Sequence, residues 1–236
     1  MKFIILPNVG YCTGRFRERG YEVAGKSEIR DRLRGLLDPV VALCSYMGIS
    51  PMGVTLFGIF FSFIGAIYVA NGKLFAGGII LIISGLADTI DGSLARSQGK
   101  VTTFGAFIDS VGDRVSEMAY FTGLVFYFMR YGQSDFTRYG QGNGTLVFFV
   151  LAALAGSFLT SYTRARAEGL GLECTVGVLE RPERVALMIV GLIFGRVVLT
   201  AVIVFLAAMS IFTFLQRVQH IRKITTEKVG DSDSVL

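Results

Sequence analysis

Long apolar stretches separated by short polar segments dominate the chain from residue 39 onward. No charged residue occurs from Pro39 to Gly72, and a helix needs about 20 apolar residues to cross a bilayer. The pattern predicts six membrane-spanning helices, at about residues 52–70, 74–97, 103–129, 145–163, 180–196 and 199–216. We therefore expect an all-α integral membrane protein.

The segment before the first span, residues 26–47, has a different pattern. Leu33 and Leu37 belong to a set of apolar residues at roughly helical spacing, and Arg30 and Arg34 lie among them. This pattern is typical of an amphipathic juxtamembrane helix whose basic residues face lipid phosphates. The alternative is that the segment is a solvated beginning of the first span.

The two ends of the chain lack such patterns. Residues 1–25 have no clear periodicity, and their apolar run is too short for a signal peptide, so we assign them to a cytoplasmic arm. Residues 26–222 are predicted to form one membrane domain, and residues 223–236 a polar cytoplasmic tail.

Composition supports the membrane assignment. The chain is 52% hydrophobic with a mean hydropathy of +0.58, and 17% of its residues are charged, compared with about 25% in soluble domains. The net charge of +5 suits anionic lipid headgroups or phosphorylated substrates. The basic residues lie between apolar runs, which argues against nucleic acid as a partner. Cys12, Cys44 and Cys174 have no metal-ligand spacing, so we expect free thiols.

The distribution of basic residues predicts the orientation in the membrane. Six spans place both termini on one side, and 18 of the 23 lysines and arginines then lie on that side. The positive-inside rule therefore puts both termini in the cytoplasm of a cell membrane. The ends of the second and third spans that carry acidic residues face the same side.

Four aspartates lie within these two spans. Asp88 and Asp91 are three residues apart, and Asp109 and Asp113 are four apart, so each pair shares one face of its helix. Two helices that meet through these faces would gather four carboxylates in one pocket. Hard divalent cations such as Mg²⁺ take oxygen ligands, and four carboxylates suit a pair of them.

Two other interpretations of the acidic pocket remain. Buried ion pairs with Arg96 and Arg114 are one, but two arginines cannot neutralise four close carboxylates. Cation or proton transport is the other, and it does not explain the small residues Gly92, Ala95 and Gly105 beside the acids. Small residues let a flat ligand approach the backbone closely, although plain helix packing would account for any one of them.

The spacing D-x2-D-G-x2-A-R-x8-G-x3-D-x3-D resembles the signature of the CDP-alcohol phosphatidyltransferase family. The residues that fill its fixed positions are Asp88, Asp91, Gly92, Ala95, Arg96, Gly105, Asp109 and Asp113. Together with the six-span layout, the resemblance covers about residues 38–222. It implies a homodimeric enzyme that transfers a phosphatidyl-type group from a CDP-linked lipid to an alcohol and releases CMP.

The resemblance also implies roles for particular residues. The four aspartates would hold two Mg²⁺ or Mn²⁺ ions that bind the donor pyrophosphate, and Asp113 would also deprotonate the acceptor hydroxyl. The residues implied to contact the CDP-lipid are Pro51, Met52, Gly53, Val54, Gly92, Ala95, Arg96, Thr102 and Gly105. Met52 departs from the family pattern, which usually has Asn or Asp at that position.

A basic cluster follows the fourth span in the sequences S-Y-T-R-A-R-A-E and E-R-P-E-R. This cluster resembles the branch of the family that uses inositol phosphate, and arginine side chains suit a phosphate monoester. The residues implied to bind the acceptor phosphate are Ser161, Arg164, Arg166, Arg181, Arg184 and Arg217. The alternative is that these arginines only anchor the cytoplasmic face.

We therefore expect transfer from CDP-diacylglycerol or CDP-archaeol to inositol 1-phosphate. Glycerol 3-phosphate is the alternative acceptor, because it is also anionic. A cation-coupled transporter is the alternative from another functional class.

Overall fold

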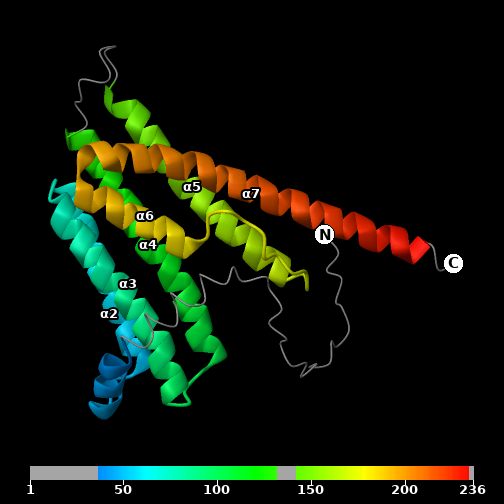
Figure 1. The fold of residues 1–236 in the computed structure, drawn as a ribbon, viewed down its shortest axis with the longest axis horizontal. Helices are drawn as coiled ribbons and strands as arrows, with labels where there is room; N and C mark the ends of the chain where they lie inside the picture. Colours follow the sequence, from blue (N-terminus) through cyan, green and yellow to red (C-terminus); the bar gives the residue numbers. More distant parts are fainter. Residues whose placement is uncertain (1–36, 132–141, 234–236) are drawn as a thin grey trace, which may run out of the picture.

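The computed structural model describes residues 37–131 and 142–233, and it is helical almost throughout these ranges (Figure 1). The helices are α2 (Pro51–Ala70), α3 (Leu74–Ser97), α4 (Thr103–Tyr131), α5 (Gly142–Glu168), α6 (Arg181–Phe194) and α7 (Arg196–Asp233). A shorter apolar helix, Leu37–Tyr46, precedes them. No strand occurs in the part of the chain that the structure describes, so the predicted all-α class is confirmed.

Local sequence signals explain where several helices begin and end. The Ser50 hydroxyl accepts a 3.1 Å hydrogen bond from the Gly53 N–H and caps α2. Glu180 and Glu183 form a reciprocal capping box at the start of α6. Gly195 ends α6 with a φ of 88°, a conformation that favours glycine, and α7 begins at the next residue.

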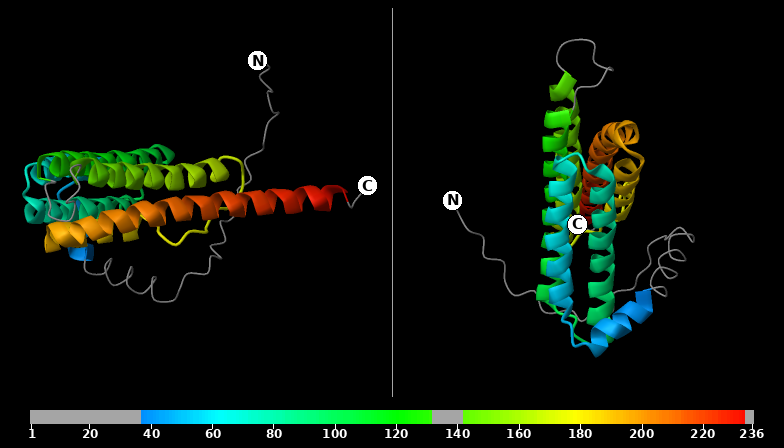
Figure 2. Two further views of the ribbon diagram at one scale, coloured as in Figure 1. Left: turned by 90° about the horizontal axis from the view of Figure 1, so that it is seen from above. Right: turned by 90° about the vertical axis from the view of Figure 1, so that its left-hand side faces the viewer.

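The helices pack as a bundle whose neighbours are not always adjacent in sequence. α2 packs against α3 and α4, α5 packs against α4 and α7, and α6 packs against α3 and α7 (Figure 2). Small residues allow the closest approaches. A Cβ atom on Gly123 of α4 would lie 2.5 Å from the carbonyl oxygen of Ala66 on α2. One on Gly156 of α5 would lie 2.8 Å from the Cβ of Ser210 on α7.

Four of the described helices are long and apolar enough to cross a membrane: α2, α3, residues 144–168 of α5 and residues 196–226 of α7. The chain is therefore a membrane protein, as predicted. α4 is long enough but carries Asp109, Asp113, Arg114 and Glu117 along its length. α6 has 14 residues and spans about 21 Å, less than the roughly 30 Å of a hydrocarbon core. The count of six spans remains a prediction.

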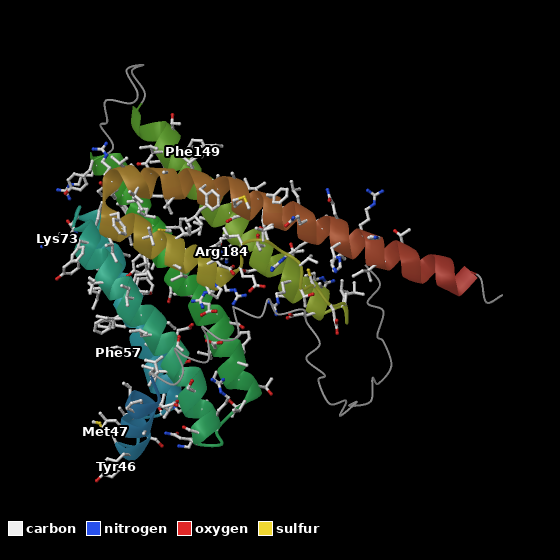
Figure 3. The ribbon with its side chains drawn as sticks, viewed as in Figure 1. Tyr46, Met47, Phe57, Lys73, Phe149 and Arg184 are labelled. Atoms are coloured by element: carbon white, nitrogen blue, oxygen red, sulfur yellow. The ribbon has the colours of Figure 1, made fainter. Side chains whose placement is uncertain are left out.

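The ends of the bundle carry the side chains expected at membrane boundaries. Tyr46 ends the helix Leu37–Tyr46 and Met47 follows it, and the two residues are 91% and 64% exposed. Figure 3 places them at one end of the bundle and Lys73 at the opposite end. The first part of the predicted juxtamembrane helix, residues 26–36, and the arm 1–25 lie outside the described residues.

α7 is longer than the sequence pattern predicts. It continues without a break from Arg196 to Asp233, through most of the segment predicted as a polar tail. Its last turns project beyond the other helices (Figure 1).

The described cysteines are free thiols. Cys44 is half-buried and Cys174 is buried in the segment between α5 and α6, whereas Cys12 lies outside the described residues. Burial raises the pKa of the Cys174 thiol above its usual value, so this thiol stays protonated at neutral pH.

Candidate active site

α3 and α4 bring the predicted acidic residues together. Asp88 comes from α3, and Asp109 and Asp113 come from α4. One carboxylate oxygen from each of these three residues lies within 4.8 Å of the others. The fourth acid, Asp91, is buried beside them and accepts a 2.5 Å hydrogen bond from the Thr55 hydroxyl of α2. All four line a small cavity of about 50 Å³ within the bundle.

The donor set of this cavity suits a hard divalent cation. Its three clustered ligands are carboxylate oxygens, which Mg²⁺ and Mn²⁺ prefer. Asp88, Asp109 and Asp113 would hold such an ion directly, whereas Asp91 lines the same cavity but is not one of the three clustered carboxylates. The predicted pairing of acidic pocket and divalent metal therefore fits the geometry.

Arg181, at the start of α6, supplies positive charge to the cluster. Its Nη1 atom lies 2.7 Å from Asp113 Oδ1 and 3.3 Å from Asp88 Oδ2. Arg114 is more distant, with its Nη1 atom 3.8 Å from Asp113 Oδ2, and it also donates to the Ser110 carbonyl. Arg96 donates to the Ser93 hydroxyl at 3.1 Å. The alternative in which Arg96 and Arg114 neutralise the acids thus finds little support in the geometry.

A larger cleft of about 900 Å³ adjoins the small cavity. Four residues line both spaces: Asp109, Asp113, Arg181 and Arg184. The predicted acceptor residues that line the cleft are Ser161, Arg164, Arg181, Arg184 and Arg217. The sixth, Arg166, is exposed and lines neither space. Residues far apart in the sequence therefore meet in one cleft, with Asp113 at its junction with the acidic cavity.

The arginines in the cleft differ in their partners. Arg164 is half-exposed and pairs with Glu168 at 2.9 Å. Arg217 is 3% exposed and donates to the carbonyls of Val176 at 2.9 Å and Thr160 at 2.7 Å. Arg217 therefore fastens the α5–α6 connection to the body of the bundle, whereas Arg164 is accessible from the cleft.

The residues predicted to contact the CDP-lipid gather at one end of the bundle. Pro51, Met52, Gly53 and Val54 form the first turn of α2, while Gly92, Ala95 and Arg96 lie near the end of α3 and Thr102 and Gly105 at the start of α4 (Figure 1). None of these nine lines the small cavity or the cleft. Their contact with a nucleotide stays a prediction.

Thr102 and Gly105 also form the start of α4, and Gly92 leaves open space beside α3. The Thr102 hydroxyl accepts a 2.9 Å hydrogen bond from the Gly105 N–H and caps α4. A Cβ on Gly92 would come no closer than 3.5 Å to the flexible end of Arg96. The backbone of α3 is therefore open to a ligand at Gly92.

The structure adds two residues that the sequence analysis missed. Thr55 holds Asp91, and Glu117 pairs with Arg184 through Oε1 and Nε, 3.2 Å apart. Both had a sequence signal. Thr55 is the threonine of the S-P-M-G-V-T segment, and Glu117 lies one helical turn after Asp113.

Several known proteins resemble this chain in sequence and in fold. Residues 49–215 match the family model described as CDP-alcohol phosphatidyltransferase. The archaetidylinositol phosphate synthase of Methanothermobacter thermautotrophicus is 31% identical over 199 residues, which are 83% of this chain and 93% of the relative. Crystal structures of Mycobacterium tuberculosis phosphatidylinositol phosphate synthase also match, one with CDP-DAG bound and one in complex with manganese and citrate. Each is 34% identical with a TM-score of 0.67; they cover 77% of this chain, and 90% and 86% of their own chains. The chain therefore belongs to the CDP-alcohol phosphatidyltransferase family.

Proposed function

We propose that this phosphatidyltransferase moves a phosphatidyl-type group from a CDP-linked lipid to inositol 1-phosphate and releases CMP. The relatives support the choice of substrates. One is an archaetidylinositol phosphate synthase, and a structural neighbour named phosphatidylinositol phosphate synthase has CDP-DAG bound. Family membership favours this enzyme over the alternative of a cation-coupled transporter.

One observation carries the proposal: a single cleft joins Asp113 to a set of arginines. An acceptor that is both a polyol and a phosphate monoester needs both features. Its phosphate would lie against Arg164, Arg181 and Arg184, because guanidinium groups bind phosphate through paired N–H groups. Its hydroxyl would then reach Asp113 at the inner end of the cleft.

The proposed reaction is an attack of the acceptor hydroxyl on the β-phosphorus of the donor. The new bond joins the acceptor oxygen to that phosphorus, the bond to the bridging oxygen breaks, and CMP leaves with the electron pair. A carboxylate oxygen of Asp113 accepts the hydroxyl proton. Divalent ions held by the aspartates would neutralise the pyrophosphate and the charge that develops on CMP. The arginines keep the acceptor phosphate in place while the hydroxyl is oriented.

The proposal includes six spans, both termini in the cytoplasm and a lipid-facing opening to the inner leaflet. The short α6 fits this topology. Its first residue, Arg181, already contacts Asp113, which is the eleventh residue of the 29-residue α4. α6 therefore begins at the floor of the cleft, and its 14 residues need to reach only the opposite membrane face. A homodimer is part of the proposal from the family resemblance.

An acceptor screen tests the function. Purified protein with Mg²⁺ and CDP-diacylglycerol or CDP-archaeol should release CMP when inositol 1-phosphate is added, and a chelator should stop the release. Faster release with glycerol 3-phosphate would instead identify the alternative acceptor. Absence of CMP with every polyol phosphate, from protein shown to be folded, would refute the enzyme.

Two neighbouring arginines provide a matched test of the acceptor cleft. Arg164→Ala should raise the KM for inositol phosphate by about tenfold and leave the KM for the CDP-lipid nearly unchanged, because Arg164 lines the cleft. Arg166→Ala removes the same charge from an exposed position outside the cleft and serves as the control. Equal KM effects of the two substitutions would show that only the overall charge of this face matters.

A further inference from the structure

Glu117 and Arg184 form a buried ion pair, and the proposed reaction gives a role to Arg184 but none to Glu117. The Nε atom of Arg184 lies 3.2 Å from Oε1 of Glu117, and the two side chains are 4% and 8% exposed. Figure 3 labels Arg184 on α6, and this residue is almost fully buried. Removing two charged groups from water is costly, and a buried pair often contributes less to stability than apolar residues of similar volume. The pair therefore calls for an explanation other than stability.

The two partners differ in whether they line the acceptor cleft. Arg184 lines both the acidic cavity and the acceptor cleft, whereas Glu117 lines the cavity but not the cleft. Glu117 thus holds the guanidinium from the side away from the cleft. The Leu179 carbonyl accepts a second hydrogen bond, from Nη1 at 3.3 Å. These two contacts fix the orientation of the guanidinium plane.

The third nitrogen of this guanidinium makes no hydrogen bond to the described residues. Nη2 of Arg184 is buried and has no hydrogen-bond partner among the residues that the structure describes. A buried N–H group without a partner is unfavourable, and it is unusual in folded proteins unless a ligand completes it. Arg184 lines the acceptor cleft, so an anionic oxygen bound in the cleft could accept a hydrogen bond from this group.

We propose that Glu117 is a positioning residue that fixes Arg184 with its free Nη2 group available to the acceptor phosphate. The negative charge of Glu117 has a specific task. Asp113 lies one turn earlier on the same face of α4, so it also attracts Arg184. Because Arg184 pairs with Glu117, it does not pair with Asp113. Asp113 can therefore interact with Arg181 and with the acceptor hydroxyl. This inference rests on the proposed function, because it requires a phosphorylated acceptor in the cleft.

The first test is Glu117→Gln, which keeps the shape of the side chain and removes its charge. The KM for the phosphorylated polyol that the wild-type enzyme uses should rise at least about tenfold, because a misplaced binding group is costly. The KM for the CDP-lipid should stay within about twofold, since Glu117 is not among the residues predicted to contact the CDP-lipid, which lie at the start of α2, near the end of α3 and at the start of α4. Glu173→Gln is the control, because Glu173 is exposed and lines neither space.

A double variant separates positioning from structural support. Arg184→Gln alone leaves Glu117 buried and unpaired, so its melting temperature should fall. Glu117→Gln combined with Arg184→Gln should recover melting temperature, yet its acceptor KM should remain as high as that of Arg184→Gln alone. If the ion pair had only a structural role, the double variant would recover both the melting temperature and the acceptor KM of the wild type.

The possible outcomes separate a failure of the positioning role of Glu117 from a failure of the proposed transferase function. Wild-type protein that releases no CMP with any polyol phosphate overturns the proposed function, and with it the inference. Wild-type protein that uses a polyol phosphate, while Glu117→Gln changes both KM values equally or neither, overturns the inference alone. An acceptor-specific rise in KM that the double variant retains supports it.

Discussion

Asp113 stands at the junction of two chemical environments. It belongs to the carboxylate cluster of the small cavity, and it also lines the cleft that holds the arginines. Its carboxylate is therefore within reach of both a cation and an acceptor hydroxyl. No other carboxylate except Asp109 lines both spaces among the described residues, and Asp113 is the one that Arg181 contacts at 2.7 Å.

Asp113→Asn tests this dual position. The amide keeps the size of the side chain but cannot accept the proton, so turnover should fall by about 10²–10⁴-fold. Binding of the CDP-lipid should largely persist, because Asp88, Asp91 and Asp109 remain. CMP release and equilibrium binding of the labelled donor measure the two effects. Unchanged turnover would remove Asp113 from the chemistry.

Thr55→Val tests the support of the fourth acid. The Thr55 hydroxyl donates to Asp91 at 2.5 Å, and the valine has nearly the same shape without the donor. The Mg²⁺ concentration for half-maximal activity should rise about tenfold or more, as expected when a group that orients a metal ligand is lost. Thr122→Val is a suitable control, because its hydroxyl only bonds to the Met118 carbonyl of its own helix. The same Mg²⁺ requirement in both variants would show that Thr55 does not act through Asp91.

At the level of the helices, sequence patterns predicted most boundaries. The second predicted span coincides with α3, and the predicted first residue of α4 is correct. The pattern missed the length of α7, because hydropathy detects the membrane segment of a helix and not its solvated continuation. Spacing also placed the acids on shared faces. It could not show which helices meet, so the contacts of Thr55 with Asp91 and of Glu117 with Arg184 required the tertiary structure.

The role of Arg217 shows a further limit of sequence patterns. The family resemblance implies that Arg217 binds the acceptor phosphate, and this stays a prediction, because Arg217 lines the cleft. The fold buries Arg217 and directs two of its donors to backbone carbonyls of residues 41 and 57 positions away in the sequence. Long-range contacts of this kind leave no periodic signal in the chain.

The packing of α4 on α2 depends on Gly123. A Cβ there would lie 2.5 Å from a backbone oxygen of α2 and 3.0 Å from the Ala66 Cα, neither of which a side-chain rotation can relieve. Gly123→Ala should therefore destabilise the protein by about 1–3 kcal/mol. Gly144→Ala, at an exposed helical position with nothing within 4 Å, should be neutral or slightly stabilising. Thermal unfolding in detergent compares the two variants, and equal melting temperatures would contradict the close approach.

The whole molecule places the clustered aspartates, the arginines of the cleft and the predicted lipid-contacting residues toward the same end of the bundle. The opposite end carries Lys73 and the turn between α2 and α3 (Figure 3). This asymmetry agrees with the distribution of basic residues along the chain, in which 18 of 23 fall on the side assigned to the cytoplasm.

Single cysteines at the two ends of α3 test the orientation. In a cysteine-free background, Lys100→Cys should react with a membrane-impermeant thiol reagent only from the cytoplasmic side, and Lys73→Cys only from the other side. Both lysines are exposed, so burial does not limit the reaction. Intact cells and inside-out vesicles provide the two sides. Labelling of both positions from one side would contradict a span between them.

Arg181 has a consequence for the order in which the site is filled. The same Nη1 atom contacts Asp113 and Asp88, so this guanidinium is occupied as long as the carboxylates lack another counter-charge. A divalent cation on the aspartates would release it toward the cleft, and the affinity for the acceptor phosphate would rise. By thermodynamic linkage, the acceptor phosphate would raise the affinity for the cation by the same factor, which is about 5–150-fold for typical coupling between two sites. Calorimetric titration of inositol phosphate with and without Mg²⁺ should show tighter binding with the cation, and in Arg181→Ala this difference should shrink. The metal site and the acceptor site would then communicate through one side chain, without any movement of the helices.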